Sequence, residues 1–184
     1  MQLHLIRNIS ICSLSFFCWI TSFGQYDTLR FPIPMQNGII SYRQTLEADR
    51  HNSKDINFRK VENWISTNSS LFQLKITNKD KNRETITGTV LFRVDIPQTG
   101  NYFWLRARIN FQIGKDSIRI QVRDFYEKPI EKGVTNDYSK IEYRWWDFKN
   151  AKPWSSEDET LFKGLDDETR KLLDSFAKWM GSVE

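Results

Sequence analysis

The stretch YFWLRARINFQI (residues 102–113) decides the fold class. Its apolar residues recur at every second position, beginning with Phe103 and Leu105, and Arg106 and Arg108 fall between them. A period of two is typical of a β-strand with one buried and one exposed face. We therefore expect these arginines to project from the face of a sheet that lies opposite its core.

Three neighbouring stretches show the same alternation of apolar and polar residues, namely residues 71–77, 85–96 and 117–123. The segments between the four strands are short and polar, which is typical of hairpins, so the strands are predicted to form an antiparallel meander. A fifth strand is expected over residues 39–47, directly after the turn dipeptide Asn37-Gly38.

Two amphipathic helices are expected to cover one face of this sheet. Residues 54–67 place Phe58, Val61 and Ile65 at spacings of three and four, and residues 157–180 carry a second apolar stripe behind three acidic residues. The predicted fold class is α+β, in the order β-α-β-β-β-β-α, with a five-stranded antiparallel sheet and two helices on one face.

The N-terminus, residues 1–24, is predicted to be a secretory signal peptide. A short basic start precedes the apolar run ISICSLSFFCWI (residues 9–20), which is too short to span a membrane. Ser22 and Gly24 supply the small residues of a cleavage site. Lipidation at Cys18 is the alternative that the sequence leaves open.

The mature chain is predicted to be exported to the periplasm, the cell surface or the medium as a single domain over residues 25–184. Within it, a core over residues 36–130 precedes an aromatic connector over residues 131–156 and a C-terminal helix over residues 157–180. No second long apolar run follows, so no transmembrane helix is expected in the mature chain. Both cysteines precede the cleavage site, so the mature domain must be stable without a disulfide.

Four segments of the chain have counterparts in a known family: Ser22 to Gln25, Glu62 to Ile65, the strand that holds Gly88, and Ile120 to Phe125. Together they resemble the uncharacterised exported domain of Bacteroidetes-type bacteria that is described as having a TATA-binding-protein-like (TBP-like) fold. The resemblance covers residues 36–130. It implies a curved antiparallel sheet with helices on one side, and it implies no established activity, cofactor or functional residue.

Seven cations fall at the polar positions of the alternating strands, a shared placement that we call their parity: Arg43, Lys75, Arg93, Arg106, Arg108, Arg119 and Arg123. Residues 36–132 hold 17 Lys plus Arg against 11 Asp plus Glu, and residues 133–184 hold 8 against 11. Guanidinium groups bind carboxylates and phosphates in bidentate geometry, so this face could bind an anionic polymer, a lipid head group or an acidic protein surface.

Two other interpretations of the basic face stay open. The cations could form a solvated face that keeps the sheet soluble. Alternatively, Asp166, Asp167 and Glu168 of the C-terminal helix could neutralise part of it. A nucleic-acid partner is not expected, because the chain is predicted to be exported.

Aromatic residues crowd the connector, and Tyr143, Trp145, Trp146 and Trp154 are the candidates for an exposed patch. Exposed rings would suit stacking against sugars or contact with another protein. The alternative is that they plug the end of the sheet or anchor the following helix.

The mature chain lacks the histidines and cysteines that most catalytic and metal-binding sites need. The mature chain has one histidine, His51, in a polar loop, and no cysteine, so neither a nucleophile–histidine pair nor a zinc site nor any other cofactor is expected. Asp124 and Glu127 are the carboxylate pair that a hydrolase could use. We therefore predict a non-catalytic binding or assembly module, with a structural protein that self-associates through the open sheet as the alternative.

Overall fold

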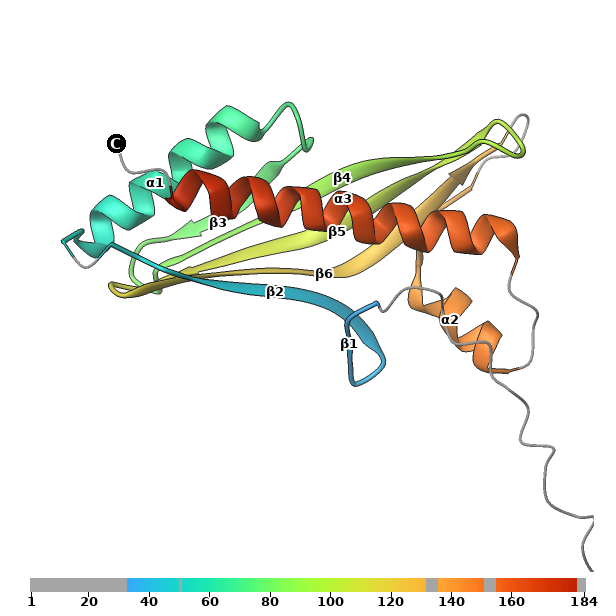
Figure 1. Ribbon diagram of the computed structural model, residues 1–184, viewed down its shortest axis with the longest axis horizontal. Helices are drawn as coiled ribbons and strands as arrows, with labels where there is room; N and C mark the ends of the chain where they lie inside the picture. The colour runs from blue at the N-terminus through green and yellow to red at the C-terminus, as the bar shows by residue number, and fades with distance from the viewer. Residues whose placement is uncertain (1–32, 50, 132–135, 151–154, 182–184) are drawn as a thin grey trace, which may run out of the picture. The chain divides into compact units, whose positions relative to one another are not determined.

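The computed structural model describes residues 33–49, 51–131, 136–150 and 155–181, which all fall within one compact unit. The fold is α+β, with one antiparallel sheet and helices packed against it (Figure 1). The elements in chain order are β1 (Met35–Gln36), β2 (Ile39–Glu47), α1 (Lys54–Asn68), β3 (Lys75–Asp80), β4 (Thr85–Ile96), β5 (Asn101–Ile113), β6 (Ser117–Ile130), β7 (Ser139–Lys140), α2 (Glu142–Lys149) and α3 (Ser156–Gly181).

The sheet is built around the predicted meander. β3, β4, β5 and β6 each pair antiparallel with their neighbours in the chain, and β2 pairs antiparallel with β6. The order across the sheet is β1-β2-β6-β5-β4-β3, with β7 also paired to β6. Strands β2 to β6 confirm the predicted five-stranded sheet. β1 and β7 were not predicted, because strands of two residues show no alternation that a sequence could reveal.

The strand predicted over residues 71–77 is displaced along the chain, because β3 begins only at Lys75. Phe72 and Leu74 are buried, as the alternation predicts, but Phe72 lies in a turn and Leu74 directly after it, before β3 begins. Their amides donate to carbonyls at the end of α1 at 3.1 and 2.9 Å, and Gln73 between them has a φ of 43°. A turn with alternating burial imitates a strand in the sequence.

β6 continues beyond the predicted end at residue 123 because a β-bulge interrupts its alternation. Asp124 has a φ of 57°, and the register against β5 shifts between Arg106 and Arg108. The extra residue moves Phe125, instead of Asp124, into the next fully buried position. The strand predicted over residues 117–123 is therefore too short at its C-terminal end.

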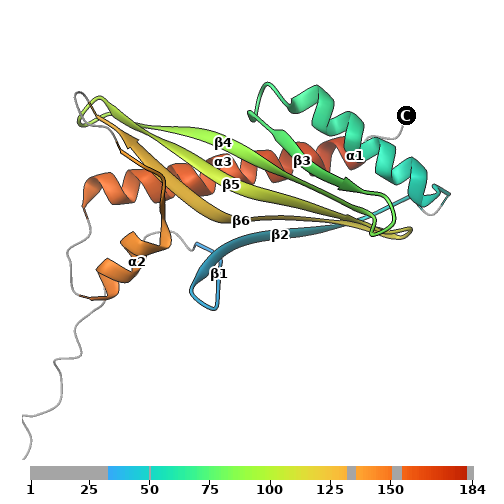
Figure 2. The same ribbon diagram turned by 180° about the vertical axis from the view of Figure 1, so that it is seen from behind.

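α1 and α3 pack on the same face of the sheet and enclose the core. Figure 1 shows α3 crossing in front of the strands, and Figure 2 shows it behind them. Trp64 from α1, Phe111 from β5 and Phe176 from α3 meet with ring centroids 5.0 to 5.9 Å apart. These edge-to-face contacts between buried rings join both helices to the sheet.

A glycine sets the distance between α3 and β4. A Cβ atom at Gly164 would lie 2.6 Å from Val94 Cγ1, which is too close for a side chain without movement. Glycine inside a helix costs about 1 kcal/mol relative to alanine. At Gly164 the missing side chain allows α3 to approach β4 closely, which offsets this cost.

Candidate functional site

The candidate site lies on the sheet face that points away from α1 and α3, which we call the open face (Figure 2). All seven predicted cations are exposed, and their registers place them on this face. Arg108, for example, lies between its strand neighbours Ala107 and Ile109, which are both buried in the core. The predicted parity is thus observed for the whole set.

The structure brings five of the seven together on the adjacent strands β2, β6 and β5. We call them the arginine cluster: Arg43, Arg106, Arg108, Arg119 and Arg123. Arg108 lies directly opposite Arg123. Lys75 is set apart on the edge strand β3, and Arg93 on β4 forms an ion pair with Asp95 at 2.7 Å.

One carboxylate lies inside the arginine cluster. Asp124 Oδ2 is 3.4 Å from Arg108 Nη1 and 3.7 Å from Arg123 Nε, distances that give weak ion pairs without a close hydrogen bond. Like charges opposite each other on neighbouring strands are destabilising. Among the described residues on the open face of β2, β6 and β5, the acidic groups are Asp124 and Glu47, so the five guanidinium groups leave a surplus of positive charge.

Neighbouring side chains hold two of the guanidinium groups in place. With its amide oxygen turned towards β2, Gln121 accepts hydrogen bonds from Arg43 Nε at 2.9 Å and Nη2 at 3.1 Å. Arg106 Cζ lies 4.4 Å from the ring centroid of Tyr138 and 5.3 Å from that of Tyr126. Such contacts reduce the freedom that an arginine would lose on binding an anion.

The open face also carries aromatic residues that sequence reasoning missed. Tyr102 and Trp104 on β5 lie with ring centroids 6.0 Å apart, and Arg93 Cζ is 4.1 Å from the Tyr102 ring. Their parity in β5 matches that of Arg106, so the alternation could have identified them. Tyr126 could not be identified in this way, because the bulge at Asp124 reverses the parity of β6.

The C-terminal helix does not neutralise the basic face. α3 lies on the other side of the sheet, and its acids pair along the helix: Asp166 with Arg170 at 2.7 Å, and Asp167 with Lys163. Asp166 Oδ1 also accepts a hydrogen bond of 2.8 Å from the hydroxyl of Tyr42, whose pKa is raised by burial and by this bond. Internal neutralisation is therefore wrong as an account of the open face.

The predicted aromatic patch divides between two environments. Trp145 of α2 is half-buried and forms an edge contact with Phe162 of α3, with ring centroids 6.3 Å apart. Tyr143 and Trp146 are 51% and 45% exposed, with ring centroids 5.3 Å apart. Trp154 lies outside the described residues. The connector thus both anchors a helix and exposes two rings.

A buried ionic cluster attaches α2 to the rest of the fold. Arg144 Nε donates to Glu127 Oε1 at 2.5 Å, and Arg144 Nη1 donates to Asp158 Oδ1 at 2.7 Å. Asp158 in turn caps α3, because its carboxylate accepts hydrogen bonds from the amide and hydroxyl of Ser155. Strand β6 and helices α2 and α3 therefore meet at Arg144.

Burial and pairing act against each other on these carboxyls. Burial raises the pKa of Glu127 above its ordinary 4.5, although the hydrogen bond from Arg144 works in the opposite direction. For Asp158, burial also favours the neutral form, but hydrogen bonds from Ser155 and Arg144 outweigh it and lower the pKa below 3.8. Because the pKa is raised at Glu127 and lowered at Asp158, Glu127 is the more easily protonated of the two carboxylates.

The structure does not bring the proposed hydrolase pair into one site. Asp124 contacts the arginines of the open face, whereas Glu127 is buried against Arg144. His51 is exposed in its loop. Among residues 33–49, 51–131, 136–150 and 155–181, no three His, Cys, Asp or Glu side chains are grouped so that they could hold a metal ion.

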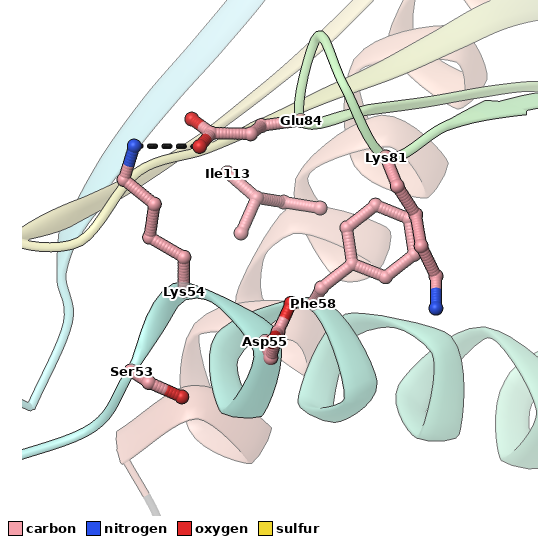
Figure 3. A pocket seen from close by; sticks show the side chains of 7 residues that line it. All are labelled: Ser53, Lys54, Asp55, Phe58, Lys81, Glu84 and Ile113. Atoms are coloured by element: carbon pink, nitrogen blue, oxygen red, sulfur yellow. Dashed lines mark hydrogen bonds and ion pairs between the residues drawn. The ribbon is translucent and has the colours of Figure 1, made fainter.

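A pocket of ≈ 370 Å³ lies at the start of α1, beside the turn between β3 and β4 (Figure 3). Phe58 and Ile113 form its apolar wall, and an ion pair of 2.5 Å between Lys54 and Glu84 crosses it. The helix terminus is already capped by Ser53, whose hydroxyl accepts from the amide of Ile56. Because Lys54 and Glu84 pair with each other and the helix end is capped, this pocket is a weaker candidate than the open face.

Comparison with known proteins defines the class of fold. No family model matches the chain, and no curated protein matches it either. Among solved structures the fold is TBP-like, as the resemblance implied. In the described part of the chain, no helix is long and apolar enough to cross a membrane.

Two particular structures share this fold. A TBP-like protein from Parabacteroides distasonis has a TM-score of 0.65 at 15% identity, covering 83% of this chain and 99% of that chain. A DUF4468 family protein from Bacteroides ovatus has a TM-score of 0.63 at 10% identity, covering 82% of this chain and 91% of that one. At such identities the likeness establishes the fold, and function must be argued from the site.

Proposed function

We propose that this protein is an exported, non-catalytic binding module that holds an anionic partner on its open face. The observation that carries the proposal is the arginine cluster, in which three adjacent strands direct five guanidinium groups to the side that α1 and α3 leave free. Planar guanidinium forks bind carboxylate or phosphate in bidentate fashion. A partner that supplies such groups would also relieve the repulsion between Arg108 and Arg123.

Self-association through the open face is the rival proposal, and charge argues against its symmetric form. A two-fold dimer places the same patch of each subunit against itself. The arginine cluster would then face a second arginine cluster, and like charges would be brought out of water together. An edge-to-edge dimer through β3 is also disfavoured, because Lys75, Lys79 and Asp80 put charges along that short strand.

The test is binding of the full chain to three anionic probes: polyphosphate, polygalacturonate and phosphatidylserine vesicles. Replacement of Arg106, Arg108 and Arg119 by Glu is expected to weaken binding at least about tenfold, because each charge-assisted hydrogen bond contributes ~1.5–3 kcal/mol. Binding of the unaltered chain should also fall at high salt, because salt screens exposed charges.

The matched control reverses three charges on the helices instead, at Arg59, Lys171 and Lys178, which are all exposed. It has the same net charge as the open-face variant and should bind as the unaltered chain does. The proposal fails if no probe binds, or if both variants lose binding equally. Light scattering after size-exclusion chromatography tests the rival, which requires a stable dimer at micromolar concentration.

A further inference from the structure

We infer that the anionic partner is an acidic polysaccharide, a chain of sugars that carry carboxylates, bound along β5 and β6 of the open face. The inference rests on the proposed function and specifies its partner. Three features of the face support it: the length of the basic track, the geometry of its arginines and the aromatic residues at one end.

The basic track is long enough for a polymer. It runs from the row of Arg119 and Gln112 to the row of Lys128 and Trp104, which are paired across β6 and β5. These rows are separated by eight residues of β5, or ~27 Å at the rise of a strand. A single small anion would contact only one or two rows, whereas an extended polyanion contacts all of them.

The arginines suit planar carboxylates. Arg106 lies against the rings of Tyr126 and Tyr138, and Arg43 is held by the Gln121 amide, so both guanidinium planes are oriented before a partner arrives. Arginine presents its donors in a fixed fork that matches the two oxygens of a carboxylate. A repeated carboxylate is therefore a good match to the repeated forks of the track.

Aromatic rings distinguish a sugar chain from other polyanions. The open-face residues of β5 run in the order Tyr102, Trp104, Arg106 and Arg108, so two rings precede two guanidinium groups along one strand. A uronic acid unit combines an apolar ring face, which packs on an aromatic side chain, with a carboxylate for an arginine. Polyphosphate and acidic peptides offer the charge without the sugar ring.

The experiment compares four probes by titration calorimetry with the full chain: polygalacturonate, its methyl ester, poly-L-glutamate and polyphosphate. Polygalacturonate is expected to bind most tightly. The methyl ester keeps the sugar backbone and removes the charge, so its binding should be at least tenfold weaker. The paired changes Arg108→Glu and Arg123→Glu should weaken polygalacturonate binding to a similar extent.

Trp104→Leu tests the sugar contact itself, because leucine keeps apolar bulk on β5 and removes the flat ring. It should weaken polygalacturonate binding about threefold to tenfold, in keeping with the contribution of an aromatic contact, and leave poly-L-glutamate binding unchanged. Trp179→Leu, at a partly exposed ring of α3 on the other side of the sheet, is the matched control and should change neither. Circular dichroism and the melting temperature show whether each variant is folded.

The outcomes separate this inference from the proposed function. If poly-L-glutamate or polyphosphate binds as tightly as polygalacturonate, or if folded Trp104→Leu binds polygalacturonate normally, the polysaccharide inference is overturned and the anionic partner stands. If none of the charged probes binds, both are overturned. Tight polygalacturonate binding that is lost in Trp104→Leu and kept in Trp179→Leu supports both.

Discussion

Replacement of Arg144 by methionine tests how α2 is held to the rest of the fold. Methionine matches much of the volume of arginine but leaves the Glu127 carboxylate, which is only 5% exposed, without its 2.5 Å partner. Breaking a buried ion pair by removing one partner costs about 3–5 kcal/mol. Because 27% of the Arg144 side chain is exposed, we expect a loss near the lower end of that range.

The pH dependence follows from the same contact. Burial holds the folded-state pKa of Glu127 above its ordinary value, so protonation of this carboxyl favours the folded state, and the benefit is lost as pH rises through the raised pKa. Loss of Arg144 removes an interaction that favours the charged form and raises this pKa further. Arg144→Met should therefore recover part of its lost stability between pH 7 and pH 5.

Urea unfolding followed by circular dichroism measures these losses of stability. In a thermal melt, Arg144→Met should lower the melting temperature by about 6–12 °C, at about 2–4 °C per kcal/mol. Adding Glu127→Gln to Arg144→Met should restore part of the stability, because it removes the more deeply buried of the two charges that lose Arg144, while Asp158 keeps its hydrogen bonds from Ser155. Arg93→Met, which breaks an exposed ion pair, is the control and should cost less than about 1 kcal/mol. A loss no larger than that of the control, with no change between pH 5 and pH 7, would refute the reasoning.

Two further predictions concern backbone positions. Gly164→Ala gains about 1 kcal/mol of helix propensity but drives a methyl group against Val94, and overpacking of this kind costs about 1–3 kcal/mol. The double variant with Val94→Ala should therefore be more stable than the two single changes predict by addition. Additive unfolding free energies would contradict the close contact. At Asp124, where φ is 57°, valine should destabilise the fold by about 1–2 kcal/mol more than glycine does, and equal urea midpoints for the two variants would contradict the bulge.

The parity of the strands made the open face predictable. In β5 the alternation around Phe103 and Leu105 fixes which side faces the core, so Arg106 and Arg108 could be assigned to the other side without coordinates. The same argument holds for β4 and for the first half of β6. Side chains in a strand alternate strictly, so one buried residue determines the side taken by its neighbours.

Parity failed where the backbone departs from a regular strand. The bulge at Asp124 moved this carboxylate to the arginine cluster and left Glu127 in the core, so two acids three residues apart are not in one site. The segment that buries Phe72 and Leu74 gave the opposite error: its burial alternates without a strand, so the sequence predicted a strand that begins too early. Both departures depend on contacts with other elements, which a local pattern does not contain.

The sequence by itself determined the class of fold, the meander and the side of each regular strand, because these depend on alternation and short connections within one segment. Only the tertiary structure decided that β2 pairs with β6, and so completes the arginine cluster with Arg43. It alone also joined Arg144 to Glu127 and Asp158 and packed Arg106 against Tyr138. These contacts link residues from different elements, and their partners are chosen by how the elements pack around one core.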